Sequence, residues 1–244
     1  MRSTTGGRAP LSPSAATDDE YPTIRRIARL PPRSSIFPVS KGNLHKLGIF
    51  GTPLFVFETL ELPGNADLVT RILDERGKTA TIQAHQIGGW HSSHDLAKRP
   101  ELCFQMLFQG IADRTTAAIG MLAEEGGLAM PGQLRCDVEA WATVMGSGDY
   151  VIPHDHPEAH FSAIFYADAG DTDVPDHPES GGLVLLDPRR GTRPLPGLDL
   201  FPQRFMIKPK SQLLAIFPSY LQHYVHPYRG KRPRVAISAN VVIV

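Results

Sequence analysis

The second half of the chain constrains its fold most strongly, because turn-forming residues divide it into short β-like runs. Eight runs rich in β-branched and aromatic residues follow one another in about 110 residues, with no helical periodicity between them. The runs are 135–145, 149–154, 160–168, 182–187, 204–208, 212–217, 223–226 and 234–243. The pattern predicts a mainly β fold, a jelly roll or barrel, and not a sheet built from βαβ units.

The first half predicts elements that flank this β core. Gly51–Glu58 reads as a β-like run, and Asn65 is placed to cap a helix that ends at Gly77. A longer helix is predicted over 101–124, where apolar residues recur at spacings of three and four before Gly126. We expect its apolar stripe to pack against the sheet.

The chain has the length of one domain with a tail. Residues 1–35 are rich in Ser, Thr, Pro and Arg with little apolar periodicity, which is typical of a flexible segment. We therefore predict a single domain over 36–244. Within it, 36–133 supply supporting helices and strands, and 134–244 supply the jelly-roll core.

Composition excludes several function classes. The 25 basic and 25 acidic residues balance to a formal charge of +0, so neither nucleic acid nor an acidic membrane surface is an expected partner. Cys103 and Cys136 cannot build a disulfide framework, and no stretch approaches the ~18–20 apolar residues of a membrane span. We expect a cytoplasmic protein with two reduced thiols; its oligomeric state is unreadable from sequence.

Three histidines suggest a metal site. His154 and His156 stand two residues apart at the end of a predicted strand, where positions i and i+2 share a face, and His223 re-enters a strand much later. A facial set of neutral imidazoles suits Fe(II) and leaves positions open. The alternatives are surface histidines in a Pro-rich loop and a buried, hydrogen-bonded His223. His226 falls on the opposite strand face, so we expect it to be structural.

The last strand carries a candidate anion site. Arg234 and Ser238 share a face with Ala236 between them, and a guanidinium buried there is costly unless it meets an anion. Its planar fork matches a carboxylate. Arg232 is the alternative, but with Arg229 and Lys231 it reads as a solvated turn. We therefore expect Arg234.

Taken in order, several motifs resemble the bacterial and phage family of 2-oxoglutarate and Fe(II)-dependent oxygenases, relatives of the prolyl-hydroxylase-like group. The resemblance covers about residues 36–244. The motifs are Phe37-Pro, Thr52-Pro-Leu-Phe-Val-Phe, Gly88-Gly-Trp-His-Ser, Trp141 leading to Gly148-Asp-Tyr, Pro153-His-Asp-His-Pro, Ser162-Ala-Ile-Phe-Tyr, Gly181-Gly-Leu, Asp187-Pro-Arg, Phe217-Pro-Ser-Tyr-Leu-Gln-His and Arg234-Val-Ala-Ile-Ser-Ala-Asn.

The resemblance implies a double-stranded β-helix that uses Fe(II), the co-substrate 2-oxoglutarate and O2. By position, His223 would be the distal iron ligand, and Arg234 and Ser238 would bind the far carboxylate of 2-oxoglutarate. Tyr166 matches a position that hydrogen-bonds this carboxylate, although it also reads as a core aromatic.

One position departs from the wider superfamily, which usually has a carboxylate two residues after its first histidine. Here His156 stands at that position. Two ligand sets remain open: His154, His156 and His223, which we favour, or a shifted register with His156, Glu158 and His223. The all-histidine set leaves the metal one negative charge short.

The implied reaction is hydroxylation of a small molecule or a peptide, with release of succinate and CO2. Two other readings stay open, a cupin-like metal dioxygenase or isomerase that does not use 2-oxoglutarate, and a non-catalytic jelly-roll binding module. Loops 86–100, 169–181 and 189–203 are expected to shape the pocket.

Two further groups have alternative readings. Trp90, His91, His94 and Asp95 either line the substrate entrance or form a loop with a packed Trp and surface histidines. Asp187 and Arg189 either form a turn with an ion pair or contribute to the mouth of the barrel, and we assign them to a structural turn.

Overall fold

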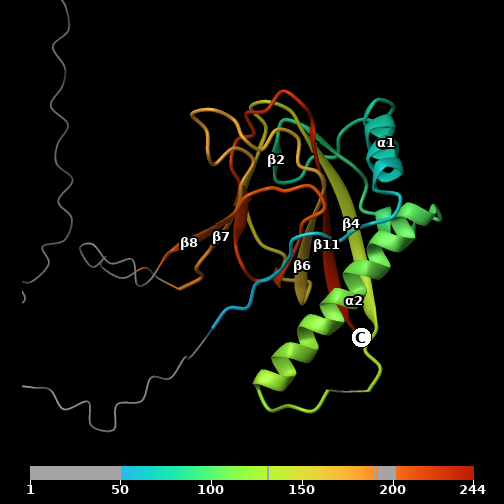
Figure 1. Ribbon diagram of the computed structural model, residues 1–244, viewed down its shortest axis with the longest axis vertical. Helices are drawn as coiled ribbons and strands as arrows, with labels where there is room; N and C mark the ends of the chain where they lie inside the picture. The colour runs from blue at the N-terminus through green and yellow to red at the C-terminus, as the bar shows by residue number, and fades with distance from the viewer. Residues whose placement is uncertain (1–50, 131, 190, 192–201) are drawn as a thin grey trace, which may run out of the picture. The chain divides into compact units, whose positions relative to one another are not determined.

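Two antiparallel β-sheets form the frame of this protein in a computed structural model (Figure 1). The six-stranded sheet has, in spatial order, β1 (Phe55–Phe57), β9 (Leu214–Pro218), β6 (Phe161–Asp168), β11 (Arg234–Ile243), β4 (Cys136–Met145) and β3 (Trp90–His91). The five-stranded sheet has β2 (Gln86–Ile87), β5 (Tyr150–His154), β10 (His223–Val225), β7 (Leu183–Leu186) and β8 (Arg204–Ile207). Most neighbouring strands are not consecutive in the chain, as in a jelly roll; among the described strands the exceptions are the pairs β3–β4 and β7–β8.

The structure describes residues 51–130, 132–189, 191 and 202–244. These residues fall within one compact unit, Phe50–Val244. The predicted tail at 1–35 and the predicted domain start at residue 36 lie outside the described residues and stay predictions.

Alternation along β11 shows how the two faces of the larger sheet are used. Ala236 lies in a buried cluster with Leu183, Leu185 and Val225 of the smaller sheet, so the two sheets pack face to face. Ile237, one residue on, lies in a second buried cluster on the other face. This is the period of two expected for a strand that is covered on both sides.

Two helices cover that other face. The apolar stripe of α2 (Leu102–Glu125) contributes Phe104, Leu107 and Ile111 to the same cluster as Ile237. The shorter helix α1 (Asn65–Arg76) lies beside it, and both run next to β4 and β11 in Figure 1. A 3-10 turn, η1 (Leu96–Lys98), precedes α2. Each such fully buried side chain contributes roughly 1.5–3 kcal/mol to folding.

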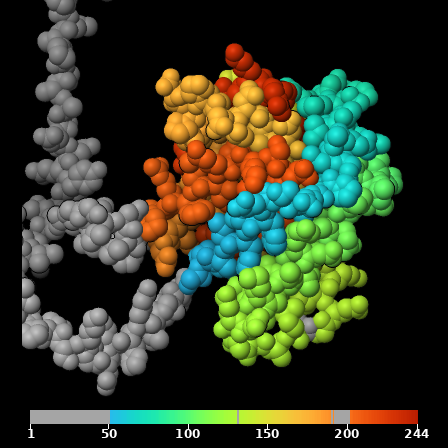
Figure 2. All heavy atoms as spheres, viewed as in Figure 1, coloured from blue at the N-terminus to red at the C-terminus, as the bar shows by residue number. Residues whose placement is uncertain are grey.

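The first strand, β1, forms one edge of the larger sheet. β1 pairs with β9 over the whole of its length, with Phe55 opposite Ile216. Figure 2 shows the segment that contains β1 crossing this face of the molecule between α2 and the orange segments near the C-terminus. The predicted run at 51–58 is therefore a strand, shorter than expected.

The predicted elements are confirmed with small shifts. All eight β-like runs of the second half are strands, and the long helix ends at Gly126 as expected. Cys103 and Cys136 are free thiols. Among the described residues, none of the helices has both the length and the apolar character required to cross a bilayer.

The predicted cap of α1 is wrong. Gly64, in a left-handed conformation (φ 79°), is the N-cap residue, and the helix end has no side-chain cap. Asn65 is instead the first helical residue, and its Nδ2 donates a hydrogen bond to the carbonyl of Ala167 (2.9 Å). The amide side chain ties the start of the helix to β6, a contact with a residue too distant in sequence to be read from local pattern.

Gly88 and Gly89 join β2 of the smaller sheet to β3 of the larger one, and both have left-handed φ values (72° and 67°). A Cβ atom on Gly89 would lie 2.7 Å from the carbonyl oxygen of Val144. This combination of left-handed backbone and close backbone contact requires glycine.

We expect Gly89→Ala to lower the free energy of unfolding by about 2 kcal/mol, because it adds backbone strain and a steric clash with the sheet. Urea denaturation would measure the change. Gly120→Ala is the matched control: Gly120 lies within α2 in open space, so alanine should stabilise the protein by about 0.5–1 kcal/mol. Equal stability of Gly89→Ala and the parent would contradict this account of the crossover.

Candidate metal centre and carboxylate site

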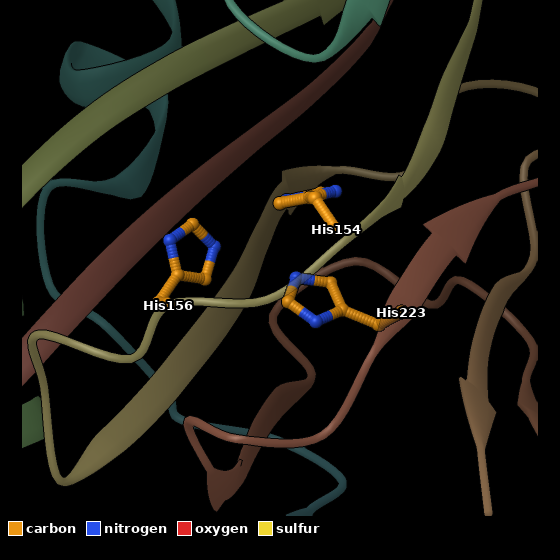
Figure 3. A group of neighbouring side chains, drawn as sticks. All are labelled: His154, His156 and His223. Atoms are coloured by element: carbon orange, nitrogen blue, oxygen red, sulfur yellow. The ribbon is translucent and has the colours of Figure 1, made fainter. Parts of the chain in front are cut away.

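Three histidines converge at one end of the space between the sheets. His154 ends β5 and His223 begins β10, and these two residues are directly paired across the antiparallel ladder. Together with His156 they each offer a ring nitrogen, and these nitrogens all lie within 4.8 Å of one another. Figure 3 shows the three rings gathered around a common space.

His156 reaches the cluster by a route other than the predicted one. β5 ends at His154, so strand alternation does not place the second imidazole. The chain turns after the strand, and the backbone N–H of His156 donates to the carbonyl of Ser219 (3.0 Å) just before β10. The His154 and His156 ring centroids lie 5.0 Å apart and their planes are nearly perpendicular.

Backbone carbonyls fix the tautomers of two of the three rings. His154 Nδ1 lies 2.8 Å from the carbonyl oxygen of Ile152, and His223 Nδ1 lies 2.9 Å from that of Leu221. Because a carbonyl can only accept, each Nδ1 carries the proton and each Nε2 keeps a lone pair. This is the arrangement that orients a metal-binding imidazole.

Burial keeps the cluster neutral. Desolvation is the main cause that lowers the pKa of His154, His156 and His223 to about 4, and repulsion between neighbouring imidazoles lowers each pKa further. At neutral pH all three rings are unprotonated, which is the state in which imidazole binds a metal ion. The donor set, three neutral nitrogens converging from one side, fits a facially bound Fe(II).

Glu158 does not join this cluster. It is exposed and lines a separate hollow with Asp137 and Glu139. The three-histidine set is the group of potential metal ligands found among the described residues. The shifted ligand set, with Glu158 in place of His154, is thus not assembled.

Arg234 is buried without an anionic partner. Only 2% of its surface is exposed, and it forms no ion pair with any described carboxylate. Its Nη1 donates to the sulfur of Met145 (3.3 Å), whereas its Nε has no hydrogen-bond partner. An uncompensated guanidinium at this depth is costly, so the position fits a bound carboxylate.

Tyr166 lies directly beside this guanidinium. The Cζ atom of Arg234 is 4.9 Å from the centre of the Tyr166 ring, and the buried hydroxyl has no hydrogen-bond partner among the described residues. Burial raises the pKa of Tyr166, an effect that the charge of Arg234 partly opposes. The hydroxyl therefore stays protonated and remains available to donate to the same anion.

Arg232, the alternative to Arg234, is already paired with a carboxylate. Arg232 is exposed, and its Nη2 contacts both carboxylate oxygens of Asp168 at 2.8 Å. Ser238, on the same face of β11 as Arg234, lines a small cavity of about 50 Å³ together with His154 and His223. The metal candidates and the inward face of β11 thus border one interior space.

The predicted entrance cluster is only partly correct. Trp90 belongs to the core beneath the helices and is 4% exposed, and Asp95 pairs with Arg99. His91 does line the cavity, because β3 places it opposite Thr143. His94 is exposed and stacks on Trp141 (4.6 Å between ring centroids).

Sequence reasoning missed two residues beside the histidines. Trp141 lies 5.6 Å from His156 between ring centroids, and exposed His85 stacks on His154 at 4.2 Å. The alternation of Trp141 with Thr143 along β4 could have indicated an inward-facing Trp. No comparable signal marked His85, which lies just before the two-residue strand β2.

Two other assignments concern residues outside the cluster. Arg189 forms the expected ion pair with Asp187 (2.8 Å), and both residues also line a surface pocket of about 280 Å³. The backbone N–H of His226 donates to Gly182, and its ring packs on Tyr224 rather than on His223.

Comparison with known proteins agrees with this geometry. Residues 139–240 match the family model described as "Putative 2OG-Fe(II) oxygenase". The matched segment runs from β4 to β11 and contains all three histidines and Arg234. Residues 139–240 therefore resemble the 2-oxoglutarate and Fe(II)-dependent oxygenases that this model describes. Enzymes of this family are oxidoreductases that use Fe(II), 2-oxoglutarate and O2.

Solved structures show the same fold at low sequence identity. The epimerase SnoN from nogalamycin biosynthesis aligns with a TM-score of 0.53 and 14% identity over 78% of this chain and 76% of its own. A prolyl hydroxylase from Trichoplax adhaerens aligns with 0.51 and 14% over 78% and 83%. The carbocyclase SnoK aligns with 0.50 and 12% over 78% and 79%. No curated protein matches the chain.

We expect the metal-free protein to lose stability as the pH falls from 6.5 towards 4. In this range the unfolded histidines bind protons while the buried ones do not, so protonation favours unfolding; above pH 6.5 the stability is fully present. In chelator-treated protein, His223→Ala should reduce this loss by on the order of 2 kcal/mol. Urea unfolding at several pH values measures the free energy of unfolding. If this free energy fell equally with pH in the variant and the parent, the prediction would be refuted.

Proposed function

We propose that this oxygenase holds Fe(II) through His154, His156 and His223 and binds 2-oxoglutarate through Arg234. In the proposed reaction a substrate C–H group becomes C–OH, while 2-oxoglutarate and O2 yield succinate and CO2. The observation that carries the proposal is the combination of a neutral histidine cluster with a buried guanidinium that has no anionic partner among the described residues and lies on the face of β11 that borders the cluster.

The side chains of this chain divide the work of binding. When bound, Fe(II) supplies the oxidative chemistry, and the three imidazoles hold it from one side. Arg234 neutralises the far carboxylate of the co-substrate, the Tyr166 hydroxyl donates to it, and Ser238 offers a further hydroxyl along the same strand face. Because Arg234 and Tyr166 are buried, water is excluded from this end of the site.

The neutral triad has an electrostatic consequence. A ferrous ion held by three imidazoles keeps its full double positive charge, whereas a carboxylate ligand would cancel one unit. In a buried site this extra charge strengthens the hold on an anionic co-substrate. It thereby assists Arg234 in recruiting 2-oxoglutarate.

The substrate is proposed to be a small molecule or a peptide. Similar folds serve both kinds of ligand: the Trichoplax structure is a complex with a peptide fragment, and SnoN has been solved with nogalamycin RO. Gln86 and His91 line the cavity beside the cluster, and the segments 86–100 and 169–181 are proposed to select the substrate. Two free cysteines and a balanced charge support placing this enzyme in the cytoplasm.

The buried guanidinium also bears on the cupin-like alternative, in which three histidines hold a metal without 2-oxoglutarate. An enzyme of that kind has no need of a desolvated cation aimed at a carboxylate. A non-catalytic binding module would in turn have no need of the metal cluster. A substitution of Arg234 therefore distinguishes the proposed 2-oxoglutarate-dependent enzyme from both alternatives.

We expect Arg234→Leu to weaken 2-oxoglutarate binding at least about 30-fold, because loss of a buried charge-assisted contact costs roughly 2–5 kcal/mol. Calorimetric titration of anaerobic, Fe(II)-loaded protein would measure the affinity. Succinate release across a panel of peptides and small molecules would report turnover.

Arg232→Leu is the matched control, since it removes a neighbouring arginine that is already paired with Asp168. It should retain the parent affinity within about 2-fold, and Arg234→Leu should unfold at no lower urea concentration than the parent because it removes an uncompensated buried charge. Unchanged affinity in Arg234→Leu would refute the assignment, and a loss confined to Arg232→Leu would support the rival arginine.

A further inference from the structure

We propose that His156 is the weakly held ligand of the triad: His154 and His223 retain the metal, and His156 is an exchangeable third arm. The inference rests on the proposed metal site and concerns how that site is divided among its histidines. It follows from three differences between His156 and the other two residues, in hydrogen bonding, in backbone setting and in neighbours.

The first difference lies in the hydrogen bonds of the rings. His154 and His223 each donate Nδ1–H to a carbonyl two residues earlier in their own strand segment, at 2.8 and 2.9 Å. Neither ring nitrogen of His156 has a hydrogen-bond partner among the residues that the structure describes. Two of the rings are thus fixed in rotation and tautomer before a metal arrives, and the third is not.

The second difference lies in the backbone. His154 and His223 sit on the paired strands β5 and β10, whose ladder directly joins them. His156 lies beyond the strand in a turn that leads through exposed Pro157 and Glu158. Two backbone hydrogen bonds hold this turn: the N–H of His156 donates to the carbonyl of Ser219 (3.0 Å), and its carbonyl accepts from the N–H of Ala159 (3.1 Å), but neither restrains the ring.

The third difference is what the rings pack against. His223 is buried, and its ring contacts Phe217 edge-on at 5.1 Å. The ring of His154 is covered by His85 in a stacked arrangement. His156 is half-buried, and its aromatic neighbour outside the triad is Trp141, at 5.6 Å in a tilted contact. His154 is also half-buried, but its ring is stacked on a neighbour at 4.2 Å, whereas the ring of His156 has no stacked neighbour among the described residues.

These differences translate into metal affinity. A ligand that is already oriented binds without a loss of rotational freedom, whereas an unrestrained imidazole loses that freedom on coordination. Removing the hydrogen-bond partners that orient a metal ligand typically costs about 10–100-fold in affinity. We expect His156 to contribute less than either of the other histidines by about this factor.

An exchangeable neutral ligand has a chemical use. Dissociation of a neutral imidazole would open a coordination position without changing the total charge of the ligands around the metal, whereas dissociation of a carboxylate would remove one negative charge from that ligand set. An incoming donor can then take that position while His154 and His223 keep the ion in place.

The test measures Co(II) affinity by competition with a chelator for the parent protein and for His154→Ala, His156→Ala and His223→Ala. We expect His154→Ala and His223→Ala to lose at least about 100-fold, and His156→Ala to lose at most about 10-fold. His226→Ala is the matched control, because its ring packs on Tyr224 outside the cluster, and it should bind like the parent.

A loss in His156→Ala as large as in the other two variants would overturn the inference while leaving the metal site intact. If all three variants bound Co(II) like His226→Ala, the proposed metal site itself would be refuted. Should an alanine at the buried position 223 prevent folding, His154→Asn and His223→Asn replace the alanine variants. The Co(II) absorption spectrum gives a second readout: it should change coordination geometry in His156→Ala while the ion stays bound.

Discussion

The pairing of β5 with β10 is the interaction on which the rest of the site depends. The ladder sets His154 directly opposite His223, two residues that are 69 positions apart in the sequence. Because the smaller sheet packs on the larger one, the same pairing turns both imidazoles toward the inward face of β11. The ends of two strands thereby gain a function that neither sequence segment could support alone, and the family match over 139–240 spans this pairing.

The space between the sheets contains several polar groups. Burial keeps the three imidazoles neutral, and the buried guanidinium of Arg234 has no anion beside it among the described residues. Both features cost folding free energy. The apolar cluster between the larger sheet and α2, on the opposite face of β11, supplies stability where no function is required. β11 thus lies between two layers. The apolar layer under the helices stabilises the fold, and the layer between the sheets contains the buried polar groups that lower its stability.

Sequence patterns were sufficient wherever a local rule decided the outcome. Alternation and turn signals located the strands, and the face shared by Arg234 and Ser238 distinguished Arg234 from solvated Arg232. They were insufficient where a distant partner decided it. Asn65 bonds to β6 rather than capping its helix, and Trp90 packs under the helices while Trp141 and His85 flank the histidines. The sequence predicted the correct neighbours for His156 for an incorrect reason. Strand alternation does not place this residue, because β5 ends at His154; a backbone hydrogen bond from His156 to Ser219 does.

The position of β11 has a further consequence. All ten of its residues pair with β4, and the residues from Val235 to Val241 pair with β6 as well, so the central amide hydrogens of β11 should exchange with solvent only when the whole domain unfolds. The turn that carries His156 has no such double protection and can open locally. Ser238, one of the groups proposed to bind a carboxylate, therefore lies in the most persistent part of the molecule, whereas the proposed exchangeable ligand lies in a segment that can rearrange at little cost.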